Sequence, residues 1–102
     1  MISLITSSKA QKIIAENMRS LRLKKGLTQE GLSERSGVSL PTLRKFEQKG
    51  LISLESFLKI SLILDSLESI IDATKPTEKE FSSIDDVVNN KNKNERKRGW
   101  KK

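Results

Sequence analysis

The chain has 102 residues, enough for one small domain with a tail, and apolar residues make up only 34% of it. Lys and Arg number 20 against 13 Asp and Glu, which gives a formal net charge of +7. Because the sequence contains neither Cys nor His, it excludes disulfides, Cys/His zinc sites, thiol nucleophiles and His-based catalysis. The basic charge makes nucleic acid the first partner to consider, and acidic proteins the second.

The charge is distributed unevenly along the chain. Residues 1–25 carry a net charge of +5, residues 53–74 carry −3 and residues 91–102 carry +6. We expect the acidic middle to face away from nucleic acid or to lie against another protein. No apolar stretch approaches the ~20 residues that span a bilayer, and the N-terminus lacks the basic and long apolar regions of a signal peptide. The sequence therefore predicts neither membrane insertion nor secretion.

The first predicted helix follows residues 6–8, whose three hydroxyls suit an N-cap. Gly26 is expected to end it. From Ala10 onward, apolar positions recur with helical spacing: Ile13, Ile14, Met18 and Leu21. The cations of this segment mostly fill the other faces: Lys9, Lys12, Arg19, Arg22, Lys24 and Lys25.

Two short helices are predicted next. Thr28 caps the first, over residues 29–35, and Gly37 breaks it. Ser39 caps the second, over residues 40–48. Two helices that meet at a turn of about four residues are typical of a helix-turn-helix, whose second helix enters the major groove of DNA. The positions expected to face inward are Leu32, Val38, Leu43 and Phe46. An ordinary helical hairpin is the alternative, but it does not need exposed Arg and Lys around its second helix.

Two further helices are predicted. The fourth begins after the Ser53 cap, and the fifth covers residues 67–73. The fourth is apolar on two sides, which is typical of a helix with two neighbours. This leaves a surplus of apolar residues that we assign to a two-fold dimer surface: Ile63, Leu67, Ile70 and Ile71. Alternatively, Ile2, Leu4, Ile5 or residues 81–88 cover it.

Residues 10–73 resemble the Cro/C1-type, phage-repressor-like regulators. The residues that carry the resemblance are Leu27-Thr28-Gln29-Glu30, Leu32, Ser36-Gly37-Val38-Ser39, Thr42-Leu43, Glu47, Leu54, Phe57, Lys59-Ile60 and Leu64. The resemblance implies an all-α, five-helix DNA-binding domain with a polar, partly disordered C-terminal tail. The expected organisation is an N-terminal arm (1–8), a helix-turn-helix and dimerisation domain (9–74) and a C-terminal extension (75–102).

The resemblance also implies which residues meet double-stranded DNA. Gln29 is expected to contact a phosphate or to brace the recognition helix. The base-facing candidates are Leu40, Pro41, Arg44 and Lys45, and the candidates for base or phosphate are Ser39 and Thr42. Lys49 and Arg19 are phosphate candidates. Because Leu40 and Pro41 offer no side-chain donors, readout shifts to Arg44 and Lys45, either of which can bind guanine with ~1–3 kcal/mol of discrimination.

The terminal segment, residues 89–102, is expected to be disordered alone because it buries too little surface to offset its ordering entropy. Three interpretations stay open: a solubilising end, a DNA-binding arm, or a partner-binding peptide anchored by Trp100. The arrangement also resembles the HipB-type antitoxins. That resemblance implies a HipA-like kinase toxin as partner, repression of the chain's own operon, and a partner-binding role for Arg96, Arg98 and Trp100.

Together these inferences predict a homodimeric repressor of an inverted-repeat operator, the antitoxin component of a toxin–antitoxin operon. We expect no catalytic residue, metal or cofactor, and a cytoplasmic, nucleoid-associated location in a bacterium or phage. A rival hypothesis is an adaptor or antitoxin that mainly binds a protein through its tail, with DNA binding secondary. A third is a coactivator that contacts the transcription machinery and little DNA.

Overall fold

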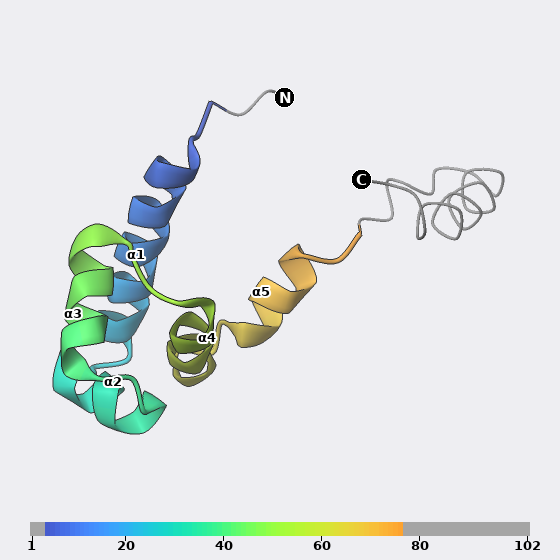
Figure 1. Ribbon diagram of the computed structural model, residues 1–102. Helices are drawn as coiled ribbons and strands as arrows, with labels where there is room; N and C mark the ends of the chain where they lie inside the picture. The colour runs from blue at the N-terminus through green and yellow to red at the C-terminus, as the bar shows by residue number, and fades with distance from the viewer. Residues whose placement is uncertain (1–3, 77–102) are drawn as a thin grey trace, which may run out of the picture. The chain divides into compact units, whose positions relative to one another are not determined.

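The computed structural model describes residues 4–76, which form five α-helices and no strand (Figure 1). The helices are α1 (Ser7–Lys24), α2 (Gln29–Ser36), α3 (Leu40–Lys49), α4 (Leu54–Ile63) and α5 (Leu67–Ala73). The predicted all-α, five-helix fold is thus confirmed. The chain divides into two units after Ile70, and only residues 71–76 of the second unit lie within the described part.

The helix starts follow the predicted caps. The hydroxyl of Thr6 accepts from the backbone N–H of Lys9 at 3.1 Å, and the other three caps, Thr28, Ser39 and Ser53, make the same contact three residues on. Each such cap typically stabilises a helix by about 1 kcal/mol. The first helix begins directly after the Thr6 cap, within the predicted cap segment, and ends two residues before Gly26.

The core lies where α1, α2, α3 and α4 meet. Helix α1 packs against α3, and α2 packs against both α3 and α4; Figure 1 shows α3 beside α1, with α2 crossing at one end. Phe46 and Phe57 join α3 to α4 through an edge-to-face contact with ring centroids 5.8 Å apart. The buried apolar residues are Ala15, Met18, Leu32, Val38, Leu43, Phe46, Ile60 and Leu64.

One face of α1 differs from the sequence prediction. The cations were expected mostly on the outer faces, but Arg22 is buried at 6% exposure. Ile13 and Ile14, in contrast, are more than 40% exposed. Ala15, Met18 and Arg22 share the inward stripe, because positions three and seven residues apart lie on one side of a helix.

Gly50 lets the end of α3 approach α1 closely. Its φ of 74° lies in the left-handed region, where it caps α3. A Cβ at this position would lie 2.8 Å from the backbone carbon and oxygen of Gln11. The Gln11 side chain also donates to the Gly50 carbonyl at 3.2 Å. Only glycine therefore fits between α3 and α1 here.

Candidate nucleic-acid interface

The turn between α2 and α3 is fixed by short hydrogen bonds. Helix α2 ends at Gly37, whose φ of 79° turns the chain and whose N–H donates to the Ser33 carbonyl. The Ser33 hydroxyl donates to the carbonyl of Val38 at 2.6 Å. Val38 is buried and its N–H donates to the Ser36 hydroxyl. The turn therefore sets the angle at which α3 leaves α2, and it gives the polar Ser33 at the helix crossing a partner.

Helix α3 presents one side to the core and another to solvent. Leu43 and Phe46 are buried, as predicted, and hold the helix against its neighbours. Leu40 and Thr42 are half-buried at its first turn. The predicted DNA-contacting residues that are exposed on or next to α3 are Ser39, Pro41, Arg44, Lys45 and Lys49. The exposed side of the predicted recognition helix is therefore cationic, as a surface facing phosphates and guanine requires.

Two of the predicted contacts are engaged within the protein. The Ser39 hydroxyl donates to the Thr42 hydroxyl at 2.8 Å and also caps α3. The first turn of α3 thus offers few free side-chain donors, since Leu40 and Pro41 have none. This arrangement leaves base readout to the middle of the helix. Arg19, predicted to contact phosphate, is exposed on α1.

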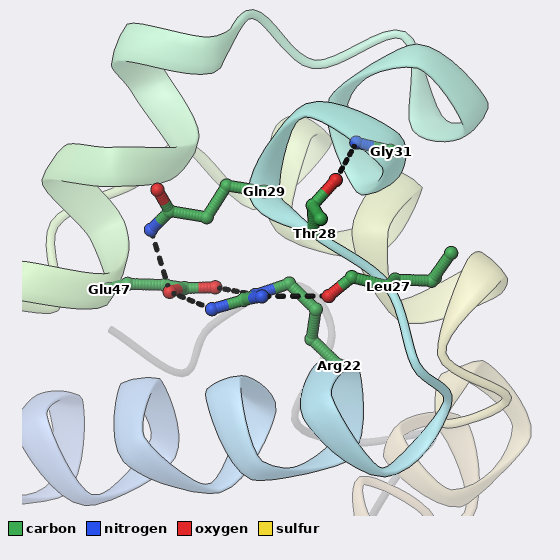
Figure 2. A network of polar contacts seen from close by, with 6 residues as sticks. All are labelled: Arg22, Leu27, Thr28, Gln29, Gly31 and Glu47. Carbon is green, nitrogen blue, oxygen red and sulfur yellow. Dashed lines mark hydrogen bonds and ion pairs between the residues drawn. The ribbon is translucent and has the colours of Figure 1, made fainter.

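A buried polar network joins α3 to α1 and to α2, as Figure 2 shows. Arg22 of α1 donates to both carboxylate oxygens of Glu47 on α3, from Nε at 2.7 Å and from Nη2 at 3.0 Å. Its Nη1 donates to the Leu27 carbonyl at 2.8 Å. The two charged side chains are only 7% and 4% exposed. Such a bidentate pair is geometrically specific, so it fixes the orientation of α3 against α1.

Gln29 completes this network from the first residue of α2. Its Nε2 donates to Oε1 of Glu47 at 2.9 Å, which is the bracing role among the two predicted for it (Figure 2). Sequence reasoning did not find Arg22 as the centre of the network. The available signal was its position seven residues after Ala15 and four after Met18, on the inward stripe of α1.

Several apolar residues of α4 and of α5 remain accessible to solvent. Among the residues predicted to dimerise, Leu67 and Ile70 are half-buried and Ile71 is 50% exposed. Ile63 is half-buried and packs against the core, so only part of its surface is accessible to a partner. Leu62, which was not predicted, is 59% exposed.

The residues proposed to cover the predicted dimer residues are only partly described. Leu4 is 86% exposed, while Ile2 and residues 81–88 lie outside the described residues. The predicted partner-binding residues of the tail lie outside them too: Arg96, Arg98 and Trp100.

A short helix capped by Thr28, a tight turn through a left-handed glycine, and a second helix with a cationic outer side define a helix-turn-helix DNA-binding domain. A family model described as helix-turn-helix matches residues 18–69, about half of the chain. The chain belongs to this family, the Cro/C1-type helix-turn-helix proteins, and is a DNA-binding transcription regulator. No curated protein matches the sequence. Within residues 4–76, no helix is long and apolar enough to cross a membrane.

Proposed function

We propose that the protein is a dimeric, sequence-specific repressor that binds an inverted-repeat operator and blocks transcription from it. The observation that carries the proposal is the exposed cationic side of α3, held in one orientation by the buried Arg22–Glu47 pair. A rigidly mounted helix can place Arg44 and Lys45 against base edges in the major groove without a large loss of freedom on binding.

The dimer part of the proposal rests on α4 and α5. Leu62 of α4 is exposed, and so are the carboxylates of Asp65, which pairs with Lys25, and of Glu68. Carboxylates repel phosphates, so this surface suits a protein partner better than DNA. A two-fold dimer places two recognition helices one helical turn of DNA apart, which matches an inverted repeat.

The proposal is tested by selecting from a random duplex pool with the full-length protein. We expect enrichment of an inverted repeat whose half-sites are separated by about 10 base pairs, with affinity falling steeply as salt rises. Enrichment of no motif at moderate salt would refute sequence-specific binding. Enrichment of a single unsymmetric site by a protein that sediments as a monomer would refute the dimer.

A matched pair of substitutions separates dimerisation from stability. Ile71→Glu places a charge on the predicted dimer surface, at a residue that is 50% exposed. Leu23→Glu places a charge on α1, at a residue that is 51% exposed. We expect the first variant to sediment as a monomer and to lose affinity for the full repeat, and the second to behave as the wild type. Equal sedimentation of the two variants would exclude this surface as the dimer contact.

The repressor's predicted role as an antitoxin depends on the tail, which lies outside the described residues, and it stays a prediction. The full-length protein and its Trp100→Ala variant, expressed with the neighbouring gene of the same operon, provide the test. We expect the neighbouring product to co-purify with the wild type and to be lost from the variant. Co-purification with both would exclude Trp100 as the anchor.

A further inference from the structure

The base-reading candidate Arg44 has an acidic neighbour on the other helix of the motif. Its Nη2 lies 3.9 Å from Oε2 of Glu30, on α2. Both side chains are accessible, with 52% and 64% of their surface exposed. Lys45 and Lys49, the other cations of this helix, form no ion pair with any residue between 4 and 76. Among the predicted readers on α3, Arg44 is thus the one that forms an ion pair with α2.

Glu30 occupies its position for a reason that does not depend on Arg44. It lies in the first turn of α2, two residues after the Thr28 cap, where the helix dipole favours a carboxylate. Glu34, one turn further along α2, is equally an exposed acid but forms no ion pair with the described residues. The two acids therefore share charge and helix, and they differ in their turn of α2 and in the contact with Arg44.

We propose that Glu30 is a specificity-determining positioning residue, which holds the Arg44 guanidinium across the α2–α3 face and lowers its attraction to phosphates. The inference rests on the proposed function, in which Arg44 reads a base. A guanidinium has five N–H donors, so the contact through Nη2 leaves donors for the O6 and N7 of guanine. The carboxylate also repels the backbone of any duplex, which weakens binding that is independent of sequence.

This arrangement has two consequences for binding. An arginine that is already restrained loses less side-chain freedom when it docks on its base, which favours the correct site. An arginine partly neutralised by a carboxylate gains less from phosphates at every other site. Both effects raise the ratio of specific to non-specific affinity, so removing the carboxylate should lower that ratio.

The experiment measures affinity for two duplexes: the motif that the wild type selects from a random pool, and a scrambled duplex of equal length and composition. The full-length variants are Glu30→Gln, Glu30→Asp and the control Glu34→Gln, each also combined with Arg44→Ala. Thermal unfolding by circular dichroism confirms that each variant is folded.

We expect Glu30→Gln to lower the affinity ratio by about 2- to 5-fold, the range of an exposed ion pair. Glu34→Gln removes the same charge from the same helix, so it should strengthen binding to both duplexes alike and leave the ratio unchanged. Glu30→Asp retains the charge but shortens the side chain by one methylene. It should therefore lower the ratio without strengthening binding to the scrambled duplex. In the Arg44→Ala background, neither substitution of Glu30 should change the ratio.

Three results would overturn the inference while leaving the proposed function intact. They are an unchanged ratio in Glu30→Gln, an equal change in Glu34→Gln, and an effect of Glu30→Gln that persists without the Arg44 side chain. If the wild type selects no motif at all, the proposed function fails and the inference fails with it.

Discussion

Replacing Glu47 with Ala is the most informative perturbation of this fold, because one carboxylate joins three segments of the chain. It accepts two hydrogen bonds from Arg22 and one from Gln29, and its side chain is 4% exposed. The substitution leaves the buried guanidinium with only the Leu27 carbonyl among the partners it has now. The variant therefore contains a charge that is both buried and unpaired.

The size of the effect follows from this burial. Removing one partner of a buried ion pair costs about 3–5 kcal/mol, because the remaining charge lacks both water and its counter-ion. A folded unit of this size has a total stability of roughly 3–10 kcal/mol. Glu47→Ala should consequently be marginally stable or unfolded. Glu47→Gln keeps the shape but turns one acceptor into a donor facing the guanidinium, and should cost about 2–3 kcal/mol.

Urea unfolding followed by circular dichroism measures these values. The control is Glu55→Ala, which removes a carboxylate that is 80% exposed and 3.5 Å from Lys59 on the same helix. Its cost should stay below about 1 kcal/mol. Combining Glu47→Leu with Arg22→Met removes both charges and should cost less than Glu47→Ala alone. A loss in Glu47→Ala no larger than that of the exposed control would refute the argument from burial.

Two further predictions concern α3. Gly50→Ala should lower the free energy of unfolding by roughly 2–4 kcal/mol, because of the positive φ and the clash with Gln11. Its control, Gly26→Ala, has a φ of 72° but open space around it, and should lower the free energy of unfolding by about 1–2 kcal/mol. Equal losses of stability in thermal unfolding would contradict the close contact. Arg44→Ala should relax preference at one base pair by about 1–3 kcal/mol, whereas Lys49→Ala should weaken binding to all duplexes alike and reduce the salt slope by about 1. Binding titrations at several salt concentrations distinguish these two effects, and a similar loss of preference in both variants would contradict the assigned roles.

Much of the fold could be predicted because its signals are local. Hydroxyl caps at Thr28, Ser39 and Ser53 mark helix starts by bonding a backbone N–H three residues on, an interaction that depends on no distant residue. Gly37 marks the turn for an equally local reason, since the positive φ there favours glycine. Helical spacing then identified the inward residues of the two short helices, among them Leu32 and Leu43.

Other features depend on contacts between segments far apart in the sequence. Arg22 and Glu47 are 25 residues apart, and neither residue type indicates burial unless its partner is known. Likewise, the need for glycine at position 50 comes from the backbone of Gln11, which packing alone brings near.

The sequence by itself therefore determined where the helices begin, which residues form the helix-turn-helix, and that its outer side is cationic. Only the tertiary structure decided that Gln29 braces α3 through Glu47 and that Arg44 lies beside Glu30. The physical reason is the range of the interactions. Caps, turns and periodicity act within a few residues, whereas ion pairs between helices exist only after packing has brought the helices together.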